Sequence, residues 1–184
     1  VQGDYRDYVT EITLSFTSDT WYNHTETVSD DNNDNIYEIS SAGQLAYIAT
    51  NSSIRENPNT VIKLTADIDL NNEEWIPIGL GTNRFEGTFD GNEHKISNFK
   101  ITQKHGGHPQ AALFGNIAGT TSFKDLTIDN AQITYPENET GDYYAAGLIG
   151  TYYGTSTITN VKVTNSTFTG NNKVAGLIAH DGVG

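Results

Sequence analysis

Three short apolar runs that contain Gly, the apolar-Gly segments, recur in the second half of this chain of 184 residues. Residues 111–115 read Ala-Ala-Leu-Phe-Gly, and residues 145–150 and 174–179 repeat the pattern around Gly-Leu-Ile. These runs, and the alternating segments between them, are too short for amphipathic helices, whose apolar positions recur about every 3.6 residues. The pattern therefore predicts strands of about four to six residues each.

A second element recurs between these runs, at residues 96–101, 123–128 and 158–163. Each copy has an apolar residue, two polar residues ending in Asn or Asp, and then an apolar-polar-apolar triplet. A short tail follows the last two copies, at residues 130–134 and 165–169. Self-similarity of this kind is the sequence signature of repeat architectures.

The spacing of the two elements defines the repeat unit. The interval from Leu113 to Leu126 is identical to the interval from Leu148 to Val161. The return segment varies, because the interval from Leu126 to Leu148 is longer than the interval from Val161 to Leu177. One connection is thus fixed and the other accepts insertions, which gives two repeats whose lengths differ only in that connection.

A single unit of this size cannot bury its own apolar residues, so successive units must stack on one another. A chain that returns to the same position once per repeat produces parallel strands, and parallel crossovers are right-handed. A propeller would need roughly 40–50 residues per blade. The sequence therefore predicts an all-β fold, specifically a right-handed parallel β-helix, or solenoid.

The predicted β-helix begins with a short capping helix. Ser41 is a suitable N-cap for a helix over residues 42–50, with Leu45, Ile48 and Ala49 on one face. An amphipathic helix over the open end of a β-helix would cover exposed strand edges and apolar side chains.

The repeats predict two regions, residues 1–35 and residues 36–184. In the first region, Ile12, Leu14 and Phe16 alternate with polar residues as in a half-buried strand, and an acidic, Asn-rich linker follows. The second region is the β-helix domain. No second cap follows its last repeat, so we expect further repeats or another chain to pack on its C-terminal end.

Several segments resemble the GLUG-repeat proteins. Besides Leu-Phe-Gly and Gly-Leu-Ile-Gly, residues 75–79 and 85–96 match this family, and residues 37–45 and 64–70 match its usual lead-in. The resemblance covers about residues 36–184. It implies a β-helical module of bacterial surface and adhesin-like proteins, a module that is also found near the N-terminus of IgA-cleaving metallopeptidases.

The amino-acid composition limits the classes of binding partner and the cellular location that we expect. Lys and Arg total 10 against 23 Asp and Glu, a net charge of −13, so nucleic acid and anionic membranes are poor partners. There is no Cys, which excludes disulfides and thiolate metal sites. No apolar run approaches the roughly 18 residues of a membrane span. A chain that opens on Val1 predicts a mature exported domain, extracellular or on the bacterial cell surface, with a lipid anchor as one option.

Acidic residues suggest no metal site. An EF-hand loop from Asp30 would need Gly at its sixth and Glu at its twelfth position, where this chain has Asn35 and Ser41. Asp67 and Asp69 form an Asp-x-Asp pair on a predicted strand, and we expect both to point outward and accept turn hydrogen bonds. The sequence predicts no cofactor and no metal.

Catalytic constellations are also missing. His94, His105 and His108 do not form a His-Glu-x-x-His motif, so the peptidase activity of some relatives does not carry over. β-Helical lyases need a base beside acidic calcium ligands, and hydrolases need paired carboxylates. The second repeated element offers only Asp125 and Asp129 in one copy and no carboxylate in the next. We predict a non-enzyme; a polysaccharide lyase or hydrolase, or the non-catalytic N-terminal part of a larger peptidase, remains the alternative.

Tyrosines supply the best functional signal, because half of those in the chain fall between positions 135 and 153. These are Tyr135, Tyr143, Tyr144, Tyr152 and Tyr153. They flank the longest insertion between repeats, and tyrosine offers a large contact area with a polar tip. They either cover strand edges or bind a ligand. The sequence predicts a surface module, adhesin-like or a stalk, in which these tyrosines bind an extracellular glycan or host protein.

Overall fold

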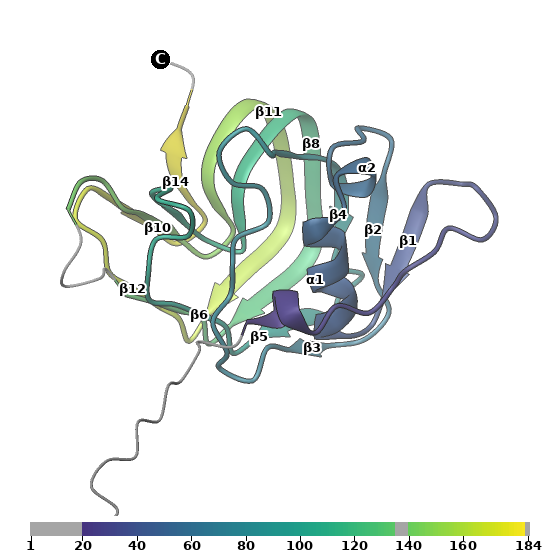
Figure 1. The fold of residues 1–184 in the computed structure, drawn as a ribbon, viewed down its shortest axis with the longest axis horizontal. Coiled ribbons are helices and arrows are strands. Elements are labelled where there is room, and N and C mark those ends of the chain that lie inside the picture. Colours follow the sequence, from purple (N-terminus) through teal and green to yellow (C-terminus); the bar gives the residue numbers. More distant parts are fainter. Residues whose placement is uncertain (1–19, 135–139, 183–184) are drawn as a thin grey trace, which may run out of the picture.

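The computed structural model describes residues 20–134 and 140–182 (Figure 1). Its elements, in chain order, are η1 (Trp21–Asn23), β1 (Ile36–Ile39), α1 (Ala42–Thr50), α2 (Ser52–Arg55), β2 (Val61–Leu64), β3 (Ile68–Asp69), β4 (Phe85–Asp90), β5 (Lys95–Ser97), β6 (Lys100–Ile101), β7 (Gln110–Ala111), β8 (Phe114–Asp129), β9 (Gln132–Ile133), β10 (Tyr144–Ala146), β11 (Ile149–Thr164), β12 (Thr167–Phe168), β13 (Lys173–Ala175) and β14 (Ile178–Asp181).

Within the described residues these strands form three sheets. The largest has the order β1-β2-β4-β8-β11-β14, with β3 beside β5 and β5 beside β8. The other two have the orders β13-β10-β7 and β12-β9-β6. The strands pair in parallel throughout these sheets. The all-β prediction is confirmed, because strands dominate the described residues and the helices are few and short.

The strand register confirms the two repeat lengths. Phe114 in β8 pairs with Ile149 in β11, and Ile149 pairs with Ile178 in β14. These are the same intervals that separate the Leu residues of the three apolar-Gly segments, at positions 113, 148 and 177. The chain therefore passes through the three sheets in the same order as β8-β9-β10 and then as β11-β12-β13. The difference in repeat length lies in the connection that precedes β10, as the spacing predicted.

Two strands are much longer than the sequence predicts. β8 and β11 each span 16 residues and curve strongly along their length (Figure 1). Asp125 and Asn160 stand at equivalent corners with φ of 52° and 51°. A residue in this left-handed conformation turns the chain sharply while the ladder continues on both sides, since Lys124 pairs with Thr159 and Leu126 with Val161. Two predicted short strands thus merge into one bent strand.

The first copy of the second element was assigned wrongly. Phe89 pairs with Phe123, but Ile96 pairs with Ile128 rather than with Phe123. Residues 96–101 therefore align with residues 128–133, which include the tail, and not with residues 123–128. The reason is that the corner after β4 is longer than the corner in β8, so the two elements drift out of phase. This corner is not a hairpin, because β4 and β5 each pair with β8.

The core between the sheets is apolar and strongly aromatic. Phe85, Phe89, Phe114 and Phe123 have no exposed surface. The ring of Phe114 lies 4.9 Å from that of Phe85, 5.3 Å from that of Phe89 and 4.9 Å from that of Phe123, measured between centroids. Tilted and edge-to-face contacts at these distances are the favoured aromatic geometries. One aromatic cluster thus holds together the neighbouring strands β4 and β8.

Helix α1 begins and ends where the sequence predicts. The Ser41 Oγ accepts a hydrogen bond of 3.2 Å from the Gln44 backbone N–H, which is the geometry of an N-cap. Leu45, Ile48 and Ala49 are buried in the same core as the strands. The helix lies next to η1 and α2, near the β1 end of the large sheet (Figure 1).

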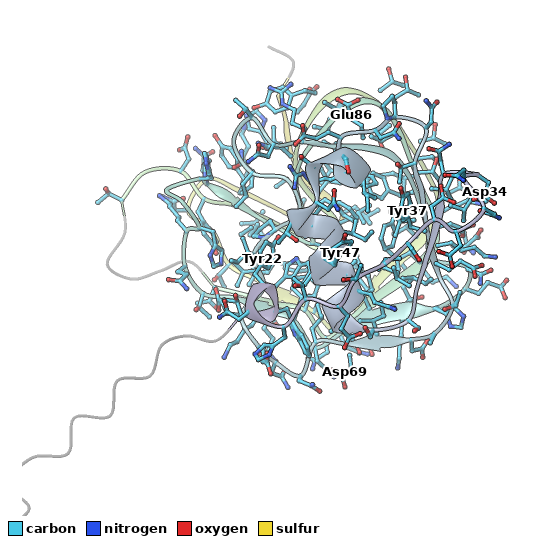
Figure 2. All side chains as sticks on the ribbon, turned by 45° about the vertical axis from the view of Figure 1, so that its right-hand side comes forward. Tyr22, Asp34, Tyr37, Tyr47, Asp69 and Glu86 are labelled. Carbon is cyan, nitrogen blue, oxygen red and sulfur yellow. The ribbon has the colours of Figure 1, made fainter. Side chains whose placement is uncertain are left out.

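The described part of the first predicted region also packs on this core. The Trp21 indole N–H donates to the Leu70 carbonyl at 3.1 Å, and the Tyr22 hydroxyl (Figure 2) donates to the Ile76 carbonyl at 2.9 Å. Burial holds the pKa of Tyr22 far above its ordinary value. The strand predicted around Leu14 lies outside the described residues.

Candidate functional site

The five tyrosines do not form one surface. Tyr135 lies outside the described residues. Tyr143 has no exposed surface and packs within the apolar core, so its ring cannot contact an external ligand. Tyr144, Tyr152 and Tyr153 are half-buried and lie at the surface.

Tyr144 is held in place on several sides. It stands in β10, where its hydroxyl donates to the Asp142 carboxylate at 3.0 Å and its ring packs against the His180 ring at a centroid distance of 4.7 Å. Partial burial and then the negative Asp142 raise its pKa. The Asn172 amide and the Tyr144 hydroxyl both donate to Asp142 and hold the pKa of this carboxyl below its ordinary value. The Tyr144 side chain is therefore fixed in position and un-ionised at neutral pH.

Tyr153 lies in β11 next to Gly182, which follows two residues after the His180 ring that packs on Tyr144. The Arg84 guanidinium carbon lies 4.1 Å from the centre of the Tyr153 ring, and the Lys173 ammonium lies 5.4 Å from the centre of the Tyr144 ring. Both distances suit cation–π contacts. We refer to Arg84, Tyr144, Tyr153, Lys173 and His180 as the tyrosine cluster.

The buried side-chain amide of Gln110 lies next to the tyrosine cluster. Gln110 in β7 pairs with Tyr144, which in turn pairs with Lys173, so the three side chains form one row across the small sheet. Gln110 is 8% exposed, and its amide donates to the Thr151 hydroxyl at 3.2 Å. This hydrogen bond joins the β7 sheet to the large sheet next to the cluster.

Tyr152 points away from this cluster, because neighbouring side chains on a strand alternate between the two faces. It packs against the core near the end of the large sheet. A hydrogen bond to Asp181, followed by the charge of that carboxylate, raises its pKa. It borders a shallow depression of about 280 Å³ that Gly154, Ser156 and Ile178 also line.

The sequence could have separated Tyr152 from Tyr153 by this alternation. It could not have found Arg84, Lys173 and His180, because they are far apart in the chain and no local motif connects them. Only the stacking of the repeats brings these side chains to the tyrosines.

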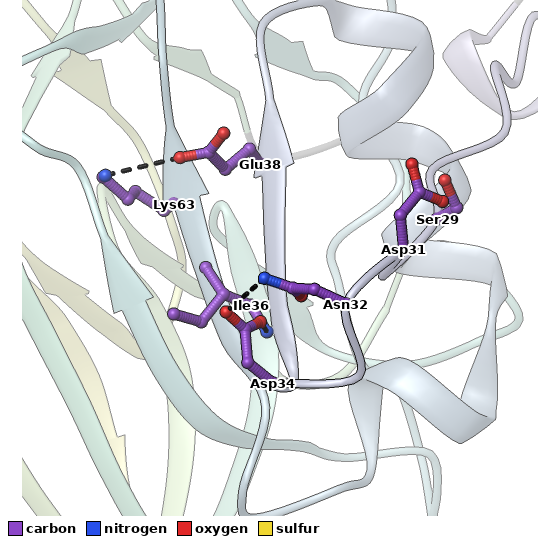
Figure 3. A pocket seen from close by; sticks show the side chains of 7 residues that line it. All are labelled: Ser29, Asp31, Asn32, Asp34, Ile36, Glu38 and Lys63. Carbon is purple, nitrogen blue, oxygen red and sulfur yellow. Dashed lines mark hydrogen bonds and ion pairs between the residues drawn. The ribbon is translucent and has the colours of Figure 1, made fainter.

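The acidic segment forms a turn with its own internal bonds. The Asp30 carboxylate accepts from the backbone N–H groups of Asp34 and Asn35, at 3.1 and 2.8 Å. Figure 3 shows the neighbouring depression of about 400 Å³, where Glu38 pairs with Lys63 at 3.4 Å. Across residues 20–134 and 140–182 no group of three or more His, Asp or Glu side chains is placed to hold a metal ion.

The other acidic and histidine candidates are spread over the surface. Asp67 and Asp69 point outward, as predicted, and both accept backbone hydrogen bonds, from Lys95 at 3.1 Å and from Asn71 at 2.8 Å. His94 lies 3.2 Å from Asp67.

His105 lies elsewhere, with its Nε2 3.3 Å from the buried Glu74 carboxylate. That carboxylate also accepts from the Thr102 hydroxyl at 2.9 Å and its backbone N–H at 2.8 Å. The contact gives the loop after β6 a fixed position. The sequence did not indicate this contact, because no local motif connects His105 to Glu74.

Comparisons with known proteins match this chain to short stretches of longer chains. No family model and no solved structure matches. Over 156 residues, 77% of this chain, it is 34% identical to Halomucin of Haloquadratum walsbyi, of which the match covers 2%. Over 102 residues, 55% of this chain, it is 35% identical to a Gly-rich membrane protein of Evansella cellulosilytica, of which the match covers 11%. The chain thus spans a small fraction of these relatives. Among the described helices, none has the length and apolar character needed to cross a bilayer.

Proposed function

We propose that this chain is a non-catalytic, surface-located module with the right-handed parallel β-helix of the GLUG-repeat proteins. The observation that carries the proposal is the register of the parallel sheets, in which Phe114, Ile149 and Ile178 pair from β8 to β11 to β14. Successive levels of one coil produce such pairing when only one connection changes length. The Gly-Leu-Ile segments stand at the same corner of successive levels, immediately before β11 and β14.

A role as a stalk segment follows from this geometry. Each level of a parallel β-helix adds about 4.8 Å along the axis, so repeats lengthen the coil without changing its cross-section. Both relatives are far longer than the region that matches, and one is named a membrane protein. A net charge of −13 on the exterior keeps such an edge-rich coil soluble.

The tyrosine cluster is the surface best suited to bind an extracellular glycan. It combines two tyrosine hydroxyls and ring edges with the donors of Arg84 and Lys173, on a rigid base. Arg84 covers one face of Tyr153 and His180 covers one face of Tyr144, so a sugar would contact the hydroxyls, ring edges and cationic groups. A protein ligand is the alternative outcome of the test below.

The carboxylates of the repeats favour a structural role over catalysis. Asp125 accepts from the Asn160 amide at 2.8 Å, and Asp129 accepts from Thr164 and Asn165, both at 2.8 Å. Both carboxylates therefore serve the contacts between levels. A glycosidase needs two carboxyl groups that face one substrate bond, so carboxylates that already accept hydrogen bonds from the neighbouring strand support a structural role instead.

A glycan array probed with the purified protein tests the binding proposal. We expect saturable binding that the double variant Tyr144→Ser/Tyr153→Ser reduces at least tenfold, because two anchoring rings are lost. Tyr37→Ser is the matched control, since Tyr37 is also half-buried but stands in β1, at the opposite edge of the large sheet (Figures 1 and 2).

Thermal unfolding of each variant, followed by circular dichroism, verifies that the fold is intact. Glycan binding that the double variant leaves unchanged would refute the assignment of the cluster. Capture of a protein but no glycan would redirect it to the protein alternative. Turnover of any polysaccharide by the wild-type chain would refute the non-catalytic proposal.

A further inference from the structure

Arg84 is a cation that the protein leaves without an acidic partner. Asp and Glu outnumber Lys and Arg in this chain by 23 to 10, so carboxylate partners are plentiful, and Lys124, for example, pairs with Asp90 at 2.8 Å. The Arg84 guanidinium lies over the Tyr153 ring instead. It makes no ion pair or hydrogen bond in the part of the chain that the structure describes, not even with Glu86, two residues further on.

The contact with Tyr153 presents this guanidinium to a ligand. Its carbon Cζ lies 4.1 Å from the centre of the Tyr153 ring, so the ring face holds the cation in place. A planar guanidinium carries five N–H donors, and its outer nitrogens fit a carboxylate or a similar oxyanion with two parallel hydrogen bonds. Neither the Arg84 Nε nor the Tyr153 hydroxyl has a hydrogen-bond partner among the described residues. Arg84 and Tyr153 therefore keep donors for an acidic group.

The Tyr144 side of the tyrosine cluster already contains a carboxylate. Lys173 lies over the Tyr144 ring, and the Tyr144 hydroxyl donates to Asp142 at 3.0 Å. Hydrogen bonds from Asn172 and Tyr144, followed by the charges of Lys173 and Lys104, hold the pKa of Asp142 below its ordinary value. The ionised Asp142 therefore offsets positive charge on this side, which suits the hydroxyl groups of a sugar better than a second carboxylate.

Both sides of the cluster lie on the same face of the large sheet. His180 pairs with Thr151, and Tyr153 stands two residues further along β11, where side chains return to the same face. Residues at this spacing are about 7 Å apart along a strand, and neighbouring strands are about 4.8 Å apart. The His180 ring packs on Tyr144 at a centroid distance of 4.7 Å. One short oligosaccharide can therefore contact Arg84 and the Tyr144 side at once.

The net charge of the chain limits the charge of such a ligand. At −13, the protein repels anions at long range, so an acidic ligand needs a local positive group to bind. Arg84 supplies one such group, which is enough for one carboxylate or one sulfate. A polyanion requires many cations, as nucleic acid does, and this surface does not provide them.

We propose that the glycan bound at the tyrosine cluster carries a single acidic group, a carboxylate or a sulfate, and that Arg84 binds this group. The inference rests on the proposed glycan binding and deepens it by naming the class of glycan. The Tyr153 hydroxyl donates a further hydrogen bond to the acidic group. The hydroxyl groups of the same glycan contact Lys173 and Asp142, which offer a donor and an acceptor.

A glycan array that holds each glycan with and without one acidic group tests this inference. Sialylated, uronic and singly sulfated glycans are compared with their neutral parents, and titration calorimetry gives the Kd of each pair that binds. We expect the acidic member to bind about tenfold more tightly or better, because hydrogen bonds to a charged acceptor are roughly twice as strong as neutral ones. The sulfated and the carboxylated pairs show which of the two groups the protein prefers.

Variants of Arg84 separate its role from that of the fold. Arg84→Gln should abolish the preference for the acidic member and leave the affinity for the neutral parent nearly unchanged. Arg84→Lys should retain part of the preference, because it keeps the charge but loses the two parallel hydrogen bonds. The matched control is Lys63→Gln, which removes a cation of β2 that pairs with Glu38 at 3.4 Å, and it should keep the whole preference.

The outcomes separate this inference from the proposed function. If acidic and neutral glycans bind equally and Tyr144→Ser/Tyr153→Ser weakens both, glycan binding stands and the acidic class is wrong. If no glycan of either kind binds, the proposed glycan binding itself is wrong. A preference for acidic glycans that survives in Arg84→Gln would overturn the role of Arg84. Tighter binding of heparin, a polyanion, than of every singly acidic glycan would overturn the single acidic group.

Discussion

One row of side chains crosses the large sheet from the aromatic cluster in β8 to the last strand, β14. Substitution of these side chains by Ala should lower the stability by amounts that decrease along the row. Phe114, Ile149 and Ile178 pair in register on β8, β11 and β14. Phe114 and Ile149 have no exposed surface, whereas Ile178 is half-buried. Truncating each of them to Ala therefore removes an apolar contact from three neighbouring parallel strands that differ in burial.

The expected magnitudes follow from burial. Phe114→Ala should cost about 5 kcal/mol, the upper end of the range for a buried Phe, because three ring contacts at 4.9 to 5.3 Å are lost with it. Ile149→Ala should cost about 3 kcal/mol, as a buried aliphatic side chain. Ile178→Ala should cost about 1 kcal/mol, since part of its surface is in water already.

Urea unfolding followed by tryptophan fluorescence measures these differences. Trp75 is a suitable reporter because it is fully buried and its indole N–H donates to the Leu113 carbonyl at 3.1 Å, next to Phe114. In a separate thermal unfolding experiment on a chain of this length, each kcal/mol of lost stability should lower the Tm by about 2–4 °C. If Phe114→Ala fails to fold, Phe114→Leu replaces it, with an expected cost of about 1.5 kcal/mol.

The reasoning would be refuted by a different order of the three losses. A cost for Ile178→Ala that equals that of Phe114→Ala would mean that Ile178 is fully covered in solution. A cost below about 2 kcal/mol for Phe114→Ala would mean that the aromatic cluster does not hold the levels together.

Two further predictions concern glycine and a carboxylate. A Cβ on Gly147 would lie 2.7 Å from the Gly176 carbonyl oxygen, whereas one on Gly176, the equivalent residue of the next level, meets nothing within 4 Å. Gly147→Ala should therefore cost about 2 kcal/mol in thermal unfolding and Gly176→Ala less than about 0.5 kcal/mol, and equal costs would contradict the stacking. Hydrogen bonds from Thr164 and Asn165 hold the pKa of Asp129 below its ordinary 3.8, so its stabilising effect should be present above that pH and disappear as the pH falls through the lowered pKa. An NMR titration should find the midpoint below 3.8 and move it upward in Asn165→Ala; a wild-type midpoint above 3.8 would show that these hydrogen bonds are absent.

Sequence alone determined the period of this protein and the class of its fold. The constant step from Leu113 to Leu126 recurs from Leu148 to Val161, and the structure keeps Leu126 and Val161 in register. Helix α1 and its N-cap Ser41 were also predictable, because capping and a short amphipathic stretch are local properties. Local pattern is informative wherever the residues that interact are close in sequence.

Tertiary structure decided the features that depend on stacking between levels. Because the corner after β4 is longer than the corner in β8, residues 96–101 align with residues 128–133. The similarity of the sequence segments alone could not reveal this shift. The left-handed corners at Asp125 and Asn160 merged the predicted short strands into single bent ones.

The candidate site divides in the same way. Composition pointed to the tyrosines, but alternation along β11 separated Tyr152 from Tyr153, and the core absorbed Tyr143. Arg84 and His180 reached the remaining rings only because the fold brings segments that are distant in sequence side by side. The sequence shows which side chain stands at each position of a strand. Which side chains lie beside it depends on the lengths of the loops between the paired strands.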